Sequence, residues 1–363
     1  MFVDYNKSIM NYVASIRSYF GLKSSYKDDE NFTKLINESK PKRIFLLLVD
    51  GMGANLINNK LAKDSFLRKN MSYQTTTVYP PTTTAATTAI RNGKSPNENA
   101  WLGWMQYLKE VDDVIIPFYG IGFYNNIDYD DCMNKYLPVT STEEELNNNG
   151  HYATKVFPSF EVDGCEDFDT MCNRLVDYSY NSQYEYVYAY WDKYDTYMHE
   201  YGPSSKICDS YLLHINYEIE RLANELNKDT MLVVVADHGQ IDVEEEINLY
   251  PKYKKYFRIK PALEPRSMAF YIKSDMKDEF KRVFNEELGD RFKLLSKKEV
   301  IESKLFGTTE NNKRFEEFLG DFIAVATDKS ILAYKKSYKK AHKGAHAGTL
   351  KDELMIPVIV VSK

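Results

Sequence analysis

Short runs of apolar, often β-branched residues recur along the chain, and three of the four end directly at an aspartate. The runs are residues 43–49, 184–191, 231–236 and 356–361, and the aspartates are Asp50, Asp192 and Asp237. Apolar runs of this length, without alternation, are typical of strands covered on both faces, as in a parallel sheet. Helical patterns at 64–70 and 204–226 lie between them, which predicts a doubly wound α/β fold with a mostly parallel sheet between helices. In such sheets the functional site lies outside the carboxyl ends of the strands, where these aspartates fall.

Two segments interrupt this rhythm. Residues from about 105 to 180 are rich in Asn, Asp and Tyr and are interpreted as a long excursion from the core. Residues 255–340 show strand patterns at 267–273, 322–327 and 331–334 and a helical pattern at 275–287. This mixture predicts a small inserted α+β subdomain, a cap or lid, within a core formed by residues 1–254 and 341–363.

The composition narrows the class of protein. Of 363 residues, 43% are hydrophobic, which is enough for a full core, and the net charge of −6 argues against binding a nucleic-acid polymer. A small anionic substrate remains compatible with this charge. We expect a cytoplasmic protein without membrane attachment, because no signal peptide or membrane-spanning run is recognisable. The four cysteines show no CxxC spacing and are expected to be free thiols. The sequence indicates no oligomeric state.

Carboxylates and imidazoles occur together in segments that fit metal ligation. Asp195 and His199 stand at i and i+4 and would share one face of a helical turn, while Asp237 and His238 are adjacent at a strand end. His346 lies in a Gly/Ala-rich loop before the last apolar run. Asp192 and His342 are alternatives to Asp195 and His346, and we expect His151 and His214 to be structural. Carboxylate and imidazole ligands without thiolate suit Zn²⁺ or Mn²⁺.

Two phosphate-binding motifs are incomplete. Gly93-Lys94-Ser95 resembles the end of a P-loop, but Thr88 stands where that motif needs a glycine. Gly51 and Gly53 lack the third glycine of a dinucleotide fingerprint, because position 56 is leucine. A threonine-rich stretch at 79–88 has two interpretations: a turn that caps a helix, or a hydroxyl nucleophile at a helix N-terminus, where the dipole favours negative charge.

The motifs occur in a specific order: VDGMG (49–53), VYPPTTTAATTAIRNGKSP (78–96), DTYMHEYGP (195–203), ADHG (236–239) and GAHAGTLKDELMIPVI (344–359). In this order the chain resembles the alkaline phosphatase superfamily, and most closely its type I phosphodiesterase / nucleotide pyrophosphatase branch, over residues 42–361. The resemblance implies an alkaline-phosphatase-like fold and two divalent cations. One would be bound by Asp50, Thr83, Asp237 and His238, and the other by Asp195, His199 and His346. Thr83 would be the nucleophile and form a phospho-enzyme intermediate.

The chain departs from the family pattern near the nucleophile. Nucleotide pyrophosphatases have His-Gly after the nucleophile helix and then an Asn that contacts the phosphate; here these positions are Asn99-Ala100 and Trp104. No arginine adjoins Thr83, which favours a phosphodiester or pyrophosphate substrate over a monoester. Trp101 and Trp104 are expected to bind the substrate by stacking, which favours a nucleotide, such as a linear or cyclic dinucleotide. A phosphomonoesterase, a phosphonate hydrolase or a phosphomutase on the same scaffold is the alternative.

Overall fold

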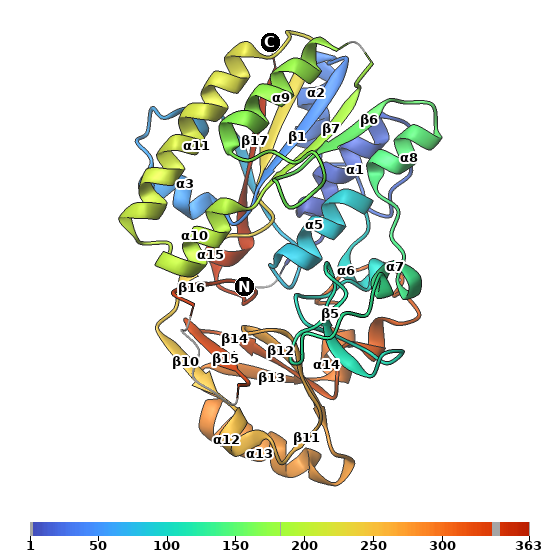
Figure 1. Ribbon diagram of the computed structural model, residues 1–363, viewed down its shortest axis with the longest axis vertical. Coiled ribbons are helices and arrows are strands. Elements are labelled where there is room, and N and C mark those ends of the chain that lie inside the picture. The colour runs from blue at the N-terminus through green and yellow to red at the C-terminus, as the bar shows by residue number, and fades with distance from the viewer. Residues whose placement is uncertain (1–2, 182, 336–341, 363) are drawn as a thin grey trace.

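The protein, seen in a computed structural model that describes residues 3–181, 183–335 and 342–362, consists of two lobes (Figure 1). The larger lobe contains a six-stranded sheet in the order β2-β17-β8-β1-β7-β6. Strands β1, β6, β7 and β8 pair in parallel. The strands are β1 (Arg43–Val49), β2 (Met71–Thr76), β6 (Ala153–Val156), β7 (Tyr186–Trp191), β8 (Thr230–Val235) and β17 (Met355–Val361). The predicted α/β class with a mostly parallel sheet is confirmed.

Helices cover both faces of this sheet (Figure 1). On one face α11 packs against α4, α9 and α10, and on the other α1 contacts α2 and α5. Their bounds are α1 (Ile9–Tyr19), α2 (Glu30–Ser39), α3 (Ala54–Lys60), α4 (Phe66–Lys69), α5 (Thr83–Asn92), α8 (Thr142–Asn148), α9 (Phe168–Tyr180), α10 (Lys193–Tyr201) and α11 (Lys206–Glu225). The strands β1, β7 and β8 are buried along their whole length, as their uninterrupted apolar character predicts.

Three details of the predicted sheet were wrong or missing. Strand β17 runs antiparallel to both neighbours, because a run of apolar residues reports burial and not direction. The two edge strands, β2 and β6, were missed, since each is only partly buried and carries polar residues. Residues 153–180, interpreted as excursion, therefore contribute β6 and α9 to the core. The predicted helix at 64–70 is only the short α4, and α3 precedes it.

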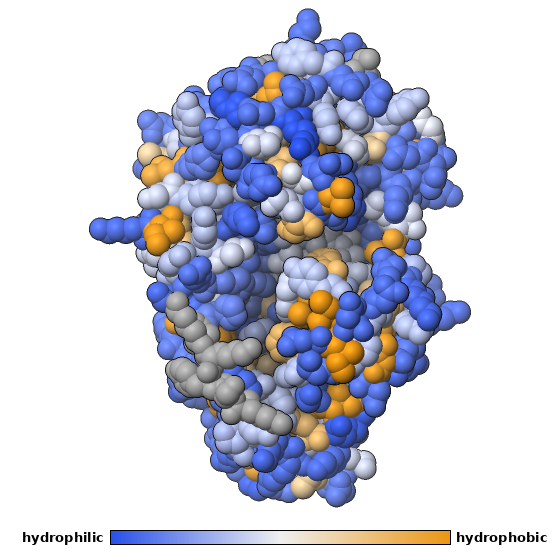
Figure 2. Space-filling model, in the orientation of Figure 1, coloured by the Kyte–Doolittle hydropathy of each residue, from blue (hydrophilic) through white to orange (hydrophobic). Residues whose placement is uncertain are grey.

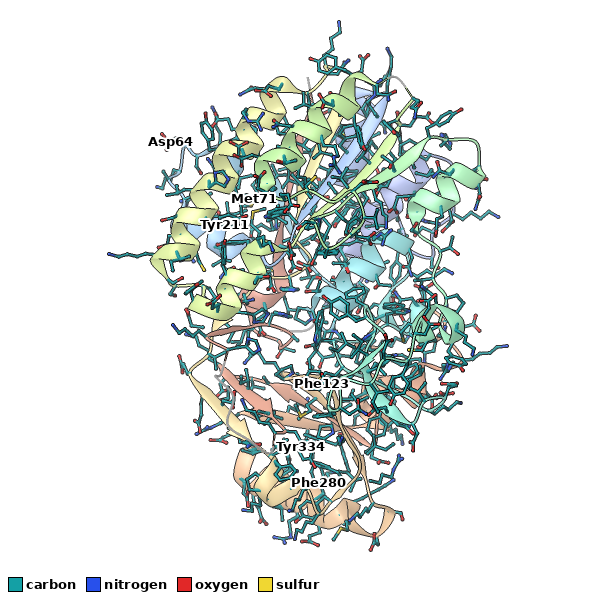
Figure 3. All side chains as sticks on the ribbon, viewed as in Figure 1. Asp64, Met71, Phe123, Tyr211, Phe280 and Tyr334 are labelled. Carbon is teal, nitrogen blue, oxygen red and sulfur yellow. The ribbon has the colours of Figure 1, made fainter. Side chains whose placement is uncertain are left out.

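The smaller lobe is built on a four-stranded antiparallel sheet in the order β11-β12-β14-β13. Its strands are β11 (Phe257–Glu264), β12 (Ser267–Ile272), β13 (Phe292–Ser296) and β14 (Phe322–Ala326). Phe280 of α13 (Lys277–Leu288) is labelled in Figure 3, in the smaller lobe. Its ring packs against Phe257 and Phe270 on one side of this sheet. The other side buries residues from 100–139 in the same hydrophobic cluster, so the first part of the Asn- and Tyr-rich segment belongs to this lobe.

Shorter elements complete the smaller lobe and the junction. They are α6 (Pro96–Asn99), β3 (Gln106–Leu108), β4 (Asp113–Ile116), β5 (Ile121–Gly122), α7 (Cys132–Tyr136), β9 (Ile241–Asp242), β10 (Glu245–Asn248), α12 (Tyr250–Tyr253), η1 (Ser274–Met276), α14 (Lys297–Glu302), η2 (Phe315–Glu317), β15 (Ser330–Ala333), β16 (Gly344–Ala345) and α15 (Lys351–Leu354). The boundary of the inserted subdomain at residue 255 stays a prediction, and its end at 340 lies outside the described residues.

The four cysteines are buried and unbonded. Among the residues that the structure describes, no helix combines the length and apolar character needed to cross a bilayer.

Candidate metal and catalytic site

The carboxyl ends of β1 and β8 bring the first group of predicted ligands together. These strands are parallel neighbours at the centre of the sheet, so Asp50 and Asp237, which follow them, lie side by side. Both carboxylates and the adjacent His238 are almost completely buried. Gly51, directly after Asp50, has a φ of +72°. A Cβ there would lie 2.7 Å from the Met198 side chain, so glycine lets Met198 pack closely against this turn. The Gly51 amide donates to Asp237 Oδ1 at 3.0 Å.

Thr83 is the first residue of α5, and its hydroxyl lies among these ligands. Thr83 Oγ1 is 3.3 Å from Asp50 Oδ2 and 3.2 Å from His238 Nε2. His238 Nε2 in turn lies 3.3 Å from Asp50 Oδ1 and 3.5 Å from Asp237 Oδ2. The four residues predicted to bind the first cation therefore form one compact group.

A second group adjoins the first. Asp195 and His199 occupy adjacent turns of α10, with 3.2 Å between Asp195 Oδ2 and His199 Nε2. His346 comes from the loop after β16, and its Nε2 lies 3.2 Å from that of His199. Its ring stacks on His238 with centroids 3.8 Å apart, so the two groups are contiguous.

The protonation pattern of the three histidines fits metal ligation. Each Nδ1 faces a backbone carbonyl oxygen, of Gly344 for His199, Gly239 for His238 and Pro81 for His346. Because a carbonyl only accepts, each Nδ1 must donate, which leaves the neutral ring with an Nε2 lone pair directed into the site. Nε2 of His199 and Nε2 of His346 lie 3.2 Å apart, so the pair needs either a shared proton or a bound cation between the two lone pairs.

Two buried carboxylate oxygens also indicate a site for a cation. Asp50 Oδ1 and Asp237 Oδ2 have no hydrogen-bond partner, a costly arrangement for buried charged groups. At this site, carboxylate and imidazole groups whose ligand atoms lie within 4.8 Å of one another form two sets, Asp50-Asp195-His238 and Asp195-His199-His346, and a third set, Asp169-His214-Glu218, lies elsewhere. Unpaired oxygen and nitrogen donors without thiolate fit divalent cations such as Zn²⁺ or Mn²⁺.

The site shifts the pKa of its ionisable groups in different directions. Burial, together with the neighbouring carboxylates, raises the pKa of Asp50, and burial also raises that of Asp237. Burial alone would raise the pKa of Asp195, but the attraction of His199 outweighs it and lowers the pKa below the ordinary range. Burial lowers the pKa of His346, which keeps this ring neutral and ready to bind a cation.

A pocket of about 900 Å³ opens from these groups, and Figure 2 shows this face of the molecule hollowed between the lobes, with apolar side chains beside the hollow on the smaller lobe. Asp50, Thr83 and Asp195 line this pocket, and so do Trp101 and Trp104 together with Phe118 and Tyr119. The structure thus places both predicted substrate-binding tryptophans in the same pocket as the predicted nucleophile.

Comparison of the sequence with known protein families identifies the family of this chain. The family model described as "Type I phosphodiesterase / nucleotide pyrophosphatase" matches residues 119–349, more than half of the chain. The chain belongs to this family. The matched range includes five of the predicted ligands but neither Asp50 nor Thr83, which the fold brings beside them. No curated protein sequence matches the chain.

Solved structures with this fold cover nearly all of the chain. Murine ectonucleotide pyrophosphatase / phosphodiesterase 5 matches with a TM-score of 0.68 and 15% identity, over 88% of each chain. An inactive variant of that enzyme, in complex with AMP, matches equally well. Phosphonoacetate hydrolase from Sinorhizobium meliloti has a TM-score of 0.66 and 12% identity, over 89% of this chain and 90% of that one. The alkaline-phosphatase-like fold is therefore confirmed, and this member of the type I phosphodiesterase / nucleotide pyrophosphatase family is an enzyme.

Three side chains of this family member that support the site were not predicted from the sequence. The Tyr190 hydroxyl donates to Asp50 Oδ2, and Gln240 Nε2 donates to Asp195 Oδ1 at 2.6 Å. Glu264, from β11 of the smaller lobe, accepts from the Thr82 hydroxyl and from the Trp104 amide, each at 2.6 Å. Burial raises the pKa of Glu264 to about 7, against the effect of these two bonds. Gln240 directly follows the ADHG segment, and Tyr190 lies in the apolar run that ends at Asp192, but no local signal marks Glu264.

A buried ion pair supports the loop that carries His346. Arg266 and Glu353 are both fully buried, with 2.6 Å between Arg266 Nε and Glu353 Oε1. Glu353 also accepts the amides of Gly348 at 2.7 Å and Leu350 at 3.0 Å, which fixes the loop after His346. The smaller lobe therefore helps to hold a predicted metal ligand of the larger lobe.

The alternative ligands lie outside both groups. Asp192 lines the pocket at the start of α10, and the His342 ring lies 4.9 Å from His199 but is exposed. His151 pairs with Glu185 at 3.0 Å and packs against Phe20, which is a structural environment. His214, also expected to be structural, lies 2.8 Å from Asp169 and near Glu218. Glu218 is buried and bound by Arg221 at 2.7 Å, so these contacts form an ion-pair network between α9 and α11.

Proposed function

We propose that the protein is a metal-dependent hydrolase of phosphodiester or pyrophosphate bonds in a nucleotide, with Thr83 as the nucleophile. The observation that carries the proposal is the position of the Thr83 hydroxyl, between Asp50 and His238, in the lining of an open pocket. Asp50, Thr83, Asp237 and His238 would hold one divalent cation. Asp195, His199 and His346 would hold the other. Such cations would supply the positive charge that lowers the pKa of a hydroxyl and stabilises phosphate oxygens in the transition state.

The proposed reaction is a double displacement at phosphorus. A bond forms between Thr83 Oγ1 and phosphorus while the bond to the leaving alcohol or phosphate breaks, which gives a phosphothreonine. The Thr83 proton lies within reach of Asp50 Oδ2 and His238 Nε2. Water then cleaves the phosphothreonine, restores the hydroxyl and releases the second product. The N-terminal end of α5 favours the negative charge on the phosphate.

The charge of the pocket favours a diester over a monoester. Two basic side chains line it, and both are paired: Arg91 with Glu143 at 3.0 Å and Lys155 with Glu161 at 3.2 Å. Further carboxylates line the pocket away from the two ligand groups, from Asp128, Asp130, Asp131, Glu144 and Asp192. A singly charged diester meets less repulsion there than a doubly charged monoester or a chain of phosphates.

The aromatic wall supports a nucleotide. Trp104 lies 5.8 Å from Tyr119 and 6.3 Å from Phe118 between ring centroids, and all three line the pocket. Aromatic faces stack on nucleobases regardless of sequence. The AMP complex of the murine neighbour shows that a protein of this fold can hold such a ligand. The pocket volume is also that of a site for a molecule of this size.

A phosphonate hydrolase is the second candidate, because phosphonoacetate hydrolase shares the fold. Phosphonoacetate is a small, highly charged anion. The aromatic and acidic lining of a 900 Å³ pocket matches a larger and less charged substrate better.

The test is a comparison of four substrates with one protein. Metal is removed with a chelator, Zn²⁺ or Mn²⁺ is restored, and hydrolysis of bis-p-nitrophenyl phosphate, p-nitrophenyl phosphate, phosphonoacetate and p-nitrophenyl thymidine 5′-phosphate is measured. Thr83→Ala serves as the control for background activity. We expect metal-dependent cleavage with preference for the diesters, and most for the nucleotide ester. Preference for the monoester would indicate a phosphatase or phosphomutase, and preference for phosphonoacetate would indicate a phosphonate hydrolase.

A further inference from the structure

Glu264 links the smaller lobe to the start of the nucleophile helix. It ends β11, is only 3% exposed, and directs one oxygen at two donors of the site region. Glu264 Oε1 accepts the Thr82 hydroxyl and the Trp104 amide, each at 2.6 Å. Thr82 immediately precedes the predicted nucleophile, and Trp104 stands where the family has its phosphate-binding Asn.

The backbone before Glu264 is held in an unfavourable conformation. Leu263 has a φ of +72°, a region that residues other than glycine rarely adopt and that costs about 1–3 kcal/mol. The chain is fixed there by hydrogen bonds in both directions between Leu263 and Met105. Gly103 allows the approach, since a Cβ on it would lie 3.1 Å from the Leu263 Cα. Strain of this kind persists where the surrounding structure requires a particular side-chain position.

The hydrogen bond to Glu264 prevents the Thr82 hydroxyl from capping the N-terminus of α5. Thr82 is the N-cap residue, with the extended backbone from which a threonine hydroxyl ordinarily accepts an amide of the first turn. Here its side chain makes no such capping bond, and its hydroxyl donates to Glu264. The first amides of a helix have no partner within the helix, so without a capping side chain they remain available to an anion.

This arrangement lies next to the reacting group. Thr83 is the first residue of α5 and lines the pocket, so the uncapped end of the helix adjoins the place of the substrate phosphate. The resemblance places Trp104 where related enzymes have a phosphate-binding Asn, so this chain is expected to lack that contact. The uncapped amides can take its place.

We propose that Glu264 is a positioning residue that draws the Thr82 hydroxyl away from the helix and so keeps the first amides of α5 open for the substrate phosphate. This inference rests on the proposed function. It predicts that Glu264 acts through Thr82 and not through its charge on the substrate.

The first test uses Glu264→Leu, which removes the acceptor and lets the Thr82 hydroxyl cap α5. A threonine cap is worth enough to weaken the competing phosphate contact by about 3- to 30-fold. We expect a loss of this size in kcat/KM for bis-p-nitrophenyl phosphate. Adding Thr82→Val removes the competing hydroxyl and should restore most of the loss, whereas a purely structural role predicts that the double variant is no better than Glu264→Leu. Glu264→Gln keeps an acceptor and should stay within about 3-fold of the wild type.

A second variant leaves Glu264 and its bond to the Trp104 amide in place. Thr82→Asn places a strongly capping side chain at the N-cap while Glu264 stays intact, and it should produce the same loss without destabilising the fold. Glu316→Leu, an exposed position in the same lobe, is the matched control. Bound metal is measured in every variant and should not change.

Binding of AMP to the zinc-loaded protein separates this inference from the proposed function. If the wild type binds AMP without cleaving diesters, the proposed function is wrong, and the variants still test the inference through AMP affinity. If the wild type cleaves diesters but Thr82→Val gives no recovery, or Thr82→Asn has no effect, the inference is wrong and the function stands. If it neither cleaves nor binds, both are wrong.

Discussion

The hydroxyl of Tyr190 offers a sharp test of the first predicted cation site. It donates to Asp50 Oδ2, while Asp50 Oδ1 has no partner and faces His238. Tyr190→Phe removes only this hydroxyl. The ring, buried to 9% exposure, keeps its packing against Phe157, whose centroid lies 5.8 Å away. The change therefore frees one carboxylate of the predicted cation site without opening a cavity.

The size of the effect follows from the partners of Asp50. Without Tyr190, Oδ2 keeps only the long contact of 3.3 Å to the Thr83 hydroxyl, so the carboxylate loses its fixed orientation. Loss of a group that orients a metal ligand typically lowers metal affinity by about 10- to 100-fold, or about 1.4–2.7 kcal/mol. Burial already raises the pKa of Asp50, and the Tyr190 bond opposes that rise. Its removal raises the pKa further, so protons compete better with the metal as the pH falls.

The assay is competition for Zn²⁺ with a calibrated chelator, from pH 6 to pH 8. We expect Tyr190→Phe to bind zinc about 10- to 100-fold more weakly at this site, with the deficit largest at the lowest pH. Tyr217→Phe, a 63% exposed tyrosine on α11, is the matched control and should bind as the wild type does. Unchanged affinity of Tyr190→Phe at every pH would refute the assignment of Asp50 as a ligand held by this tyrosine.

Three further predictions concern reactivity, stability and proton competition. Thr83→Ala should lower kcat/KM for the preferred diester by at least about 10³-fold while the fold by circular dichroism stays unchanged; residual activity within tenfold of the wild type would contradict a covalent mechanism. Arg266→Met leaves the buried Glu353 charge unpaired and should reduce the free energy of unfolding by about 3–5 kcal/mol in urea. Glu353→Gln added to it removes that charge, keeps an acceptor for the Gly348 and Leu350 amides and should restore part of this loss; equal instability of the double variant would argue against the pair. Burial lowers the pKa of His199, but Asp195 outweighs burial and raises it, so zinc must displace a proton from this ring. The affinity of the second predicted site for zinc should therefore rise with pH, by up to about tenfold per pH unit, until the pH exceeds the raised pKa. Calorimetry at several pH values measures this affinity, and an affinity independent of pH would exclude the competition.

Several features of the fold and the site could be predicted from local sequence. The buried strands β1, β7 and β8 could be predicted from their unbroken apolar runs, because both of their faces are covered. Asp50 and Asp237 could be assigned to one edge because parallel neighbouring strands end together. Asp195 and His199 share a helical face by their spacing.

The direction of β17 and the edge strands β2 and β6 could not be predicted in this way. An apolar run is the same in either direction, and a half-covered strand carries too few apolar residues to be recognised. The separate lobe was expected from residues 255–340, but its hydrophobic core also draws on residues 100–139, a pairing that no local pattern shows.

By itself the sequence determined which residues are candidates for the chemistry, since a ligand type and its spacing are local properties. Only the tertiary structure decided what surrounds them. Tyr190 on Asp50, Gln240 on Asp195, and Glu264 on Thr82 are contacts between segments up to 182 positions apart. Such contacts depend on how strands and lobes pack, and packing depends on burial summed over the whole chain rather than on any neighbouring residue.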